Sequence, residues 1–235
     1  MLRSSEAFAD NAERTARRFA EGPLSRGIAV FGSYARGDYT PASDLDLLVI
    51  HAGRAPEEIL DGLDPRVSVV FYTAERFARL PLVSPLFNLH LVTEAAILDD
   101  SHGLIGSNLG SVAGFAREDV ARVAASSQRR MRDIVNLPPR RRLSGELYAV
   151  AKQSAMLLSA AHGSPTFNRA QAFEQLEQLA PQLSDDVRTA IRLETHWLSL
   201  RARYTQAAVS ASASELEAVR RIVEAVTHVV GRSSR

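Results

Sequence analysis

The chain has 235 residues, of which 46% are hydrophobic and 23% are charged, a composition typical of one or two globular domains. The absence of cysteine excludes a disulfide framework and a thiolate metal site. Residues 1–21 lack the apolar stretch of a signal peptide, and the uncharged run from Leu80 to Thr93 is too short for a bilayer. We therefore expect a cytoplasmic protein that does not enter a membrane.

The net charge of +1 conceals an asymmetry along the chain. Residues 1–111 hold 10 basic and 15 acidic side chains, whereas residues 112–235 hold 18 basic and 12 acidic ones. The basic second half suits an anionic partner. A glycine- and serine-rich segment over 103–114 marks a boundary, and we predict domains over residues 1–110 and 111–235.

The first half of the chain alternates between strand and helix signals. Runs of apolar residues indicate strands, and apolar residues spaced three and four apart indicate helices. In chain order we expect a helix over 2–20, a strand over 28–31, a strand carrying Asp44 and Asp46, a helix over 56–63, a strand over 67–72, helices over 73–80 and 84–94, and a strand over 95–98. The predicted fold class is α+β, with a mixed β-sheet and flanking helices.

The second half is predicted to be entirely helical. Five amphipathic helices are expected over 115–135, from Ser144 to Gly163, over 168–179, over 184–204 and from Ser214 onward. Ser184 is expected to cap the fourth helix, and Ser214 with Glu217 forms the pattern of a capping box before the fifth. Five such helices predict a C-terminal helical bundle.

The acids of the second strand carry the functional prediction. Side chains alternate along a strand, so Asp44 and Asp46 project from the same face of the sheet. Two neighbouring carboxylates repel each other unless a cation lies between them, and Mg²⁺ is commonly held by one or two carboxylates together with substrate phosphates. Gly32 and Ser33 form a turn at which the backbone can approach a phosphate closely, and the serine hydroxyl adds a donor.

These residues resemble a known family. Gly32 and Ser33, separated by ten residues from Asp44 and Asp46, are similar to the signature of the DNA polymerase β-like nucleotidyltransferase superfamily. The segment Gly32 to Gly37 resembles its minimal and antibiotic nucleotidyltransferases. The resemblance implies a Mg²⁺-dependent enzyme that transfers a nucleoside monophosphate from an NTP to a hydroxyl and releases pyrophosphate.

The resemblance also implies the partners. They are an NTP and an acceptor, which in this family is an RNA end, a protein side chain or a small molecule such as an aminoglycoside. The basic second half favours nucleic acid or protein over a polycationic antibiotic. A homo-oligomer is an open alternative.

One position departs from the family pattern. A third carboxylate usually stands on the strand paired with the Asp44–Asp46 strand, and here the aligned position is Ser68, or Arg66 on the same face, and neither is an acid. Another carboxylate could fill in, the substrate or a water could take the proton, or catalysis could be lost. Glu194 is a candidate general base, because its expected place on an apolar helix stripe would raise its pKa; pairing with an arginine is the structural alternative.

Two basic residues are candidate nucleotide ligands. Arg36 follows the glycine–serine turn and could steady a phosphate or Asp38. Lys152 could reach a triphosphate, although a solvated lysine is the ordinary alternative.

Other functions are kept as alternatives. Without the third acid, the domain could be a catalytically silent binding or regulatory module. Arg221 and His228 fit the loose spacing of ribonucleases that share a helical fold, which predicts a toxin activity instead. Arg129, Arg130, Arg132, Arg140, Arg141 and Arg142 could hold a polyanion, or could simply be solvated.

Overall fold

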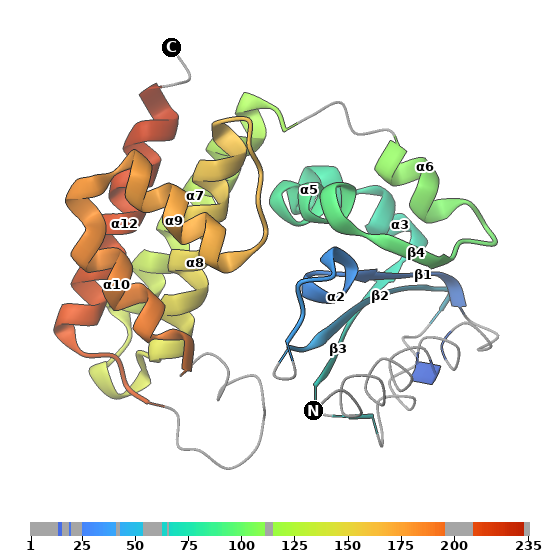
Figure 1. Cartoon of the computed structure of the whole chain (residues 1–235), viewed down its shortest axis with the longest axis horizontal. Coiled ribbons are helices and arrows are strands. Elements are labelled where there is room, and N and C mark those ends of the chain that lie inside the picture. Colours follow the sequence, from blue (N-terminus) through green and yellow to red (C-terminus); the bar gives the residue numbers. More distant parts are fainter. Residues whose placement is uncertain are drawn as a thin grey trace. The chain divides into compact units, whose positions relative to one another are not determined.

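The computed structural model describes residues 14–15, 19, 25–40, 43–53, 63–64, 66–110, 115–195 and 209–232. The chain divides into two compact units, Met1–Gly114 and Phe115–Arg235 (Figure 1). The helix expected over 2–20 is described only at residues 14, 15 and 19, which are helical, and the helix expected over 56–63 lies outside the described residues except for Leu63. Among the described helices, none is long and apolar enough to cross a bilayer.

The first unit is built on a mixed four-stranded sheet. The strands are β1 (Ser25–Phe31), β2 (Leu45–His51), β3 (Val67–Thr73) and β4 (Ala96–Asp99), in the order β3-β2-β1-β4. β1 runs antiparallel to both β2 and β4, whereas β2 and β3 are parallel. The predicted mixed sheet with flanking helices is confirmed.

Apolar side chains fill both faces of this sheet, because odd and even positions of each strand point to opposite sides. One face holds Ala29, Phe31, Leu48 and Ile50, packed with Phe77, Leu80, Leu91 and Ile105 from helices. The other holds Ile28, Leu45, Leu47, Val49 and Phe19. Figure 1 shows α3 (Ala74–Ala78), α5 (Pro85–Glu94) and α6 (Leu104–Gly110) on one side of the sheet, with α4 (Leu80–Val83) between α3 and α5 in the chain.

Helix α6 lies within the glycine- and serine-rich segment over 103–114 that marked the predicted domain boundary. At its start, Asp100 accepts hydrogen bonds from the backbone N–H groups of Ile105 (3.0 Å) and Gly106 (2.8 Å). Ile105 is buried in the core, and Asn108 donates to the Phe77 carbonyl at 2.7 Å. Capping by the carboxylate of Asp100, just before the helix, and the burial of Ile105 therefore stabilise a helix that its glycine content disfavours.

The second unit is helical, as predicted. Its elements are α7 (Arg117–Asn136), α8 (Ser144–Ala161), α9 (Arg169–Leu179), α10 (Ser184–Arg192) and α12 (Ala213–Arg232), with short 3₁₀ turns at Pro139–Arg141 and Pro181–Leu183. α8 packs against α7, α9, α10 and α12. It is rich in alanine and serine and is buried around most of its circumference, which allows several helices to approach it closely.

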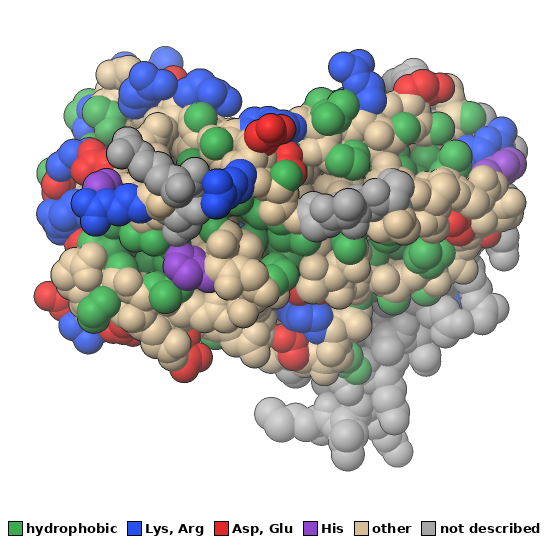
Figure 2. Space-filling view, turned by 90° about the horizontal axis from the view of Figure 1, so that it is seen from above, with side chains coloured by type: hydrophobic (Ala, Val, Ile, Leu, Met, Phe, Trp, Pro, Cys, Tyr) green, Lys and Arg blue, Asp and Glu red, His purple; other side chains and the backbone are tan. Residues whose placement is uncertain are grey.

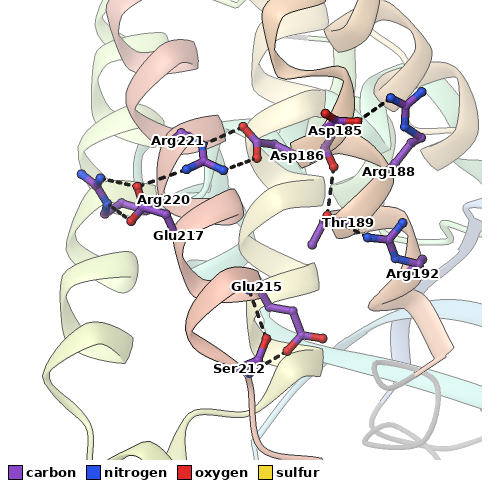
Figure 3. Close-up of polar contacts among 10 residues, drawn as sticks. All are labelled: Asp185, Asp186, Arg188, Thr189, Arg192, Ser212, Glu215, Glu217, Arg220 and Arg221. Carbon is purple, nitrogen blue, oxygen red and sulfur yellow. Dashed lines mark hydrogen bonds and ion pairs between the residues drawn. The ribbon is translucent and has the colours of Figure 1, made fainter.

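Both predicted serine caps of this unit are wrong in detail. The hydroxyl of Ser184 donates to the Pro181 carbonyl at 2.9 Å instead of capping α10. At α12 the capping box is formed by Ser212 and Glu215. The Ser212 N–H donates to Glu215 Oε2 at 2.7 Å, and the Glu215 N–H donates to Ser212 Oγ at 3.2 Å (Figure 3). α10 ends at Arg192, and residues 196–208 lie outside the described ranges.

Candidate functional site

The site is built around a tight turn between β1 and the single-turn helix α2 (Ser33–Arg36). Gly32 has φ 75° and ψ −151°, a combination that is essentially restricted to glycine. A Cβ added there would lie 2.9 Å from Asp46 Oδ2, so the glycine permits a close approach between the turn and this carboxylate. The Arg36 N–H donates to the Gly32 carbonyl at 3.1 Å and closes the turn.

Asp46 lies on the second residue of β2, opposite Phe31 of β1 and beside Ser68 of β3. It is half-buried, and it projects from the same face as Leu48 and Ile50. Asp44 precedes β2, so the alternation of side chains along a strand determines only the face from which Asp46 projects. The sequence therefore predicted the place of Asp46 more firmly than that of Asp44.

The carboxylate of Asp44 interacts electrostatically with the guanidinium of Arg66. Arg66 binds Asp64 through its backbone N–H (2.9 Å), Nε (3.0 Å) and Nη2 (2.8 Å). The side-chain hydrogen bond with Asp64 raises the pKa of Arg66, and the charges of Asp64 and Asp44 add to that effect. The same hydrogen bond lowers the pKa of Asp64.

The missing third acid is a real feature of the sheet. The parallel register pairs Asp46 with Ser68, which is the position expected to carry the third carboxylate, and β3 reads VSVVFYT. Within the described ranges, no group of three or more His, Cys, Asp or Glu is placed to hold a metal ion. A cation at this site would therefore need ligands from its substrate as well as from Asp44 and Asp46.

The guanidinium of Arg36 is hydrogen-bonded to two carboxylates of the protein. Its Nε donates to Asp38 Oδ2 at 3.1 Å, and its Nη1 donates to Glu94 Oε2 at 2.6 Å. Burial opposes the charged form, but these hydrogen bonds and charges outweigh burial and raise the pKa of Arg36. Glu94 and His90 of α5 were missed by the sequence analysis, although their i, i+4 spacing on one helix was a usable signal.

Lys152 and Glu194 belong to the second unit and share a neighbour there. Lys152 Nζ lies 5.9 Å from the centre of the buried Tyr148 ring. Burial raises the pKa of Tyr148 above its ordinary value, and the charge of Glu194 adds to this rise. Glu194 Oε1 lies 2.7 Å from Arg169 Nε. The arginine partner that was the structural alternative for Glu194 is thus present, and the expected burial is incomplete because the Glu194 side chain is 25% exposed.

Arg221, the residue behind the ribonuclease alternative, is engaged in a structural ion pair. Its Nε and Nη2 donate to Asp186 Oδ2 (2.9 Å) and Oδ1 (2.6 Å), and its Nη1 reaches Glu217 Oε1 at 3.3 Å (Figure 3). Asp186 is buried, so this bidentate contact joins α10 to α12. An arginine held in this way does not favour a catalytic role.

The clustered arginines also divide into different roles. Arg142 donates to the carbonyls of Leu137 (2.8 Å) and Val135 (2.7 Å) at the end of α7, which is a structural function. Arg129, Arg130, Arg132, Arg140 and Arg141 are exposed. Figure 2 shows blue and red side chains interspersed over the face that it draws, as on an ordinary solvated surface.

A cavity of about 530 Å³ lies at the other end of the sheet. It is lined by Arg26 of β1, His51 of β2 and Thr73 of β3, together with residues of the adjoining segments. β1 ends at the glycine–serine turn and β2 begins beside it. The cavity is therefore separate from the site at Gly32 and Asp46.

Residues 13–93 match the family model described as a nucleotidyltransferase domain. A spectinomycin adenyltransferase, AAD(9) from Enterococcus faecialis, solved with ATP and spectinomycin, has a TM-score of 0.54 and 10% identity, over 95% of this chain and 98% of that chain. At this identity the likeness shows the fold. No curated protein sequence matches the chain.

Two further solved structures are less similar. A toxin-antitoxin with AMP-PNP has a TM-score of 0.30 and 16% identity, over 54% of this chain and 97% of that chain. A nucleotidyltransferase-like protein from Exiguobacterium sibiricum 255-15 has a TM-score of 0.33 and 18% identity, over 94% and 75%. At these TM-scores neither one carries weight for the function.

Proposed function

We propose, from the premise that residues 13–93 match a nucleotidyltransferase domain, that the chain belongs to the DNA polymerase β-like superfamily and transfers a nucleoside monophosphate from an NTP to an acceptor hydroxyl. Pyrophosphate is the leaving group. The observation that supports this most directly is the approach of the Gly32 turn to Asp46, with an added Cβ only 2.9 Å from Oδ2. The glycine brings the backbone of the turn close to the Asp46 carboxylate, where a metal-bound phosphate chain would contact both.

The acids present fit Mg²⁺. Asp44 and Asp46 would hold it, and phosphate oxygens of the substrate would complete its coordination. When bound, the ion neutralises charge on the phosphates and on the leaving group. Because α2 has only four residues, its dipole is small, so the grip on phosphate falls to backbone N–H groups of the turn and to the hydroxyl of Ser33.

The proton of the attacking hydroxyl still needs an acceptor. Ser68 cannot act as a carboxylate base. Glu194 is the candidate base from the sequence, but its pairing with Arg169 and its partial exposure favour the structural role, so its part in catalysis is decided by substitution. Lys152 is the corresponding candidate for a phosphate contact, since the ring of Tyr148 supports its ammonium group. Glu194→Gln should lower kcat with little change in KM for the NTP if the glutamate takes the proton.

The acceptor is proposed by class. The AAD(9) structure contains ATP and spectinomycin, so ATP is the first nucleotide to test and an aminocyclitol is the first small-molecule acceptor. The excess of basic residues over 112–235 favours an anionic acceptor such as RNA, or a protein hydroxyl, over a polycation.

A transfer assay tests this proposal. The protein is incubated with each α-labelled NTP, Mg²⁺ and a panel of spectinomycin-type antibiotics, total tRNA and the protein itself. Asp46→Asn is the inactive variant. Asp185→Asn is the matched control, because Asp185 is an exposed acid of α10. We expect label to be transferred by the wild type and by Asp185→Asn; transfer by Asp46→Asn at the same rate would refute the assigned chemistry.

A second candidate is a silent binding module, favoured by Ser68 beside Asp46. It predicts that Mg²⁺-ATP binds and that Asp46→Asn weakens the binding, but that label is transferred to no acceptor. Calorimetric titration with Mg²⁺-ATP alongside the transfer assay separates it from the enzyme.

A further inference from the structure

One carboxylate of α5 is enclosed beside the glycine–serine turn. The side chain of Glu94 is 4% exposed, and its Oε2 accepts from Arg36 Nη1 at 2.6 Å and lies 2.8 Å from His90 Nε2. An enclosed carboxylate is unfavourable unless it is paired and hydrogen-bonded. Each partner of Glu94 also contacts a segment next to the glycine–serine turn: Arg36 belongs to α2, and His90 contacts Phe31. The cluster therefore connects α5 to both sides of the turn.

Arg36 provides the first route. It is the last residue of α2, and the two arms of its guanidinium reach Asp38 and Glu94. None of the four residues of α2 is fully buried. Tyr34 packs against the core cluster on the other face of the sheet, whereas the ion pair of Arg36 with Glu94 ties α2 to α5.

His90 provides the second route. Its ring stands edge-on to the ring of Phe31, with centroids 5.4 Å apart and planes at 88°. Phe31 immediately precedes Gly32 and lies opposite Asp46 in the sheet. Glu94 orients His90 against Phe31 from one side of the turn and holds Arg36 on the other side.

The geometry points to Arg36, Glu94 and His90 as positioning residues that set the distance between the Gly32–Ser33 turn and Asp46, and thereby the fit of a metal-bound NTP. This inference rests on the proposed function. It assigns Arg36 a role through the turn. Of the two partners that the sequence left open for Arg36, a phosphate and Asp38, Asp38 is the one it contacts here. Movement of α2 by a fraction of an ångström would matter, because a Cβ added at Gly32 would lie only 2.9 Å from Asp46 Oδ2.

The test is the affinity for Mg²⁺ with α,β-methylene-ATP, whose α–β bond cannot be cleaved in the transfer reaction. Titration calorimetry is done on the full chain for the wild type, Arg36→Ala, Arg36→Lys, Glu94→Gln and the double variant Arg36→Ala/Glu94→Gln. Each is measured well below its own melting transition, with the fold checked by circular dichroism. Arg188→Ala is the matched control, because Arg188 is exposed and pairs with a single acid, Asp185.

We expect Arg36→Ala and Glu94→Gln each to weaken binding roughly tenfold, the order expected for one hydrogen bond to a charged group. The double variant should bind no more weakly than either single variant, because both changes break the same tether. Arg36→Lys should lie between, since one ammonium cannot match both arms of the guanidinium. Arg188→Ala should bind like the wild type.

The outcomes separate the two proposals. Folded single variants that bind as tightly as the wild type, or effects that multiply in the double variant, overturn the positioning role and leave the proposed function standing. A wild type that binds no Mg²⁺-nucleotide overturns the proposed function, and the positioning role fails with it. A merely structural tether would lower the melting temperature of the single variants without changing their affinity.

Discussion

Replacing Gly32 with alanine separates the two constraints on the turn. The first is conformational: at φ 75° and ψ −151°, a residue with a Cβ is strained by about 1–3 kcal/mol. The second is steric, since the new Cβ would lie 2.9 Å from Asp46 Oδ2 and must displace that carboxylate. In a chain of this size each kcal/mol lowers the melting temperature by about 2–4 °C, so a measurable fall is expected.

Gly37→Ala is a close control for this change. Gly37 also has a positive φ, 78° with ψ 10°, so alanine there is destabilising by about 1–2 kcal/mol. An added Cβ at Gly37, however, would meet no heavy atom of the described residues within 4 Å. The two variants therefore share backbone strain and differ in the contact with Asp46.

Thermal unfolding and calorimetric titration with Mg²⁺ and α,β-methylene-ATP test both variants. We expect both to lose stability and only Gly32→Ala to lose nucleotide affinity, by roughly tenfold or more if one ligand of the site is displaced. Equal affinities for the two variants would show that the approach of Gly32 to Asp46 has no part in binding, and would refute the reasoning on which the site is built.

Three further predictions concern stability. Ser212→Ala removes the capping box of α12 and should lower the free energy of unfolding by about 1 kcal/mol in denaturant titrations, whereas Ser214→Ala should have less effect. Leu158→Ala empties a buried position of α8 and should lower it by about 2–5 kcal/mol; a loss below 1 kcal/mol would contradict the packing described for α8. The lowered pKa of Asp64, caused by its hydrogen bond with Arg66, stabilises the folded state above the unfolded pKa of about 3.9 and is lost as pH falls through the folded value. Asp64→Asn should therefore be less stable than wild type at pH 6, and the difference should shrink on acidification in pH-dependent denaturant titrations.

Local signals in the sequence were sufficient for most of the fold. The apolar runs of β1, β2 and β3 and the helical stripes of the second unit depend on neighbouring residues. The match of residues 13–93 to a nucleotidyltransferase domain agrees with the resemblance seen from Gly32 to Asp46. The sequence did not decide between two equivalent capping-box patterns at the start of α12. Two serines each precede a glutamate by three residues, and Glu217 is taken by Arg220 and Arg221, which leaves Glu215 to form the cap.

The candidate site depended more on distant residues. Glu94 lies 58 positions from Arg36 in the sequence, and no periodicity links the two. The stripe that placed Glu194 among apolar residues ran through Val187 and Ile191. Val187 is buried, but Ile191 is 43% exposed, because α10 buries Ala190 in its place. A hydrophobic pattern identifies a helix more securely than it identifies which side of that helix faces the core.

Lys152 is the only lysine in the sequence, and its place over the Tyr148 ring on α8 has a practical consequence. Amine-directed reagents have one side-chain target in the entire protein. A fluorophore or an acetyl group coupled there would be attached at a defined point of α8, next to a buried tyrosine. The natural sequence thus provides a single-site spectroscopic handle on the second unit without the introduction of a cysteine.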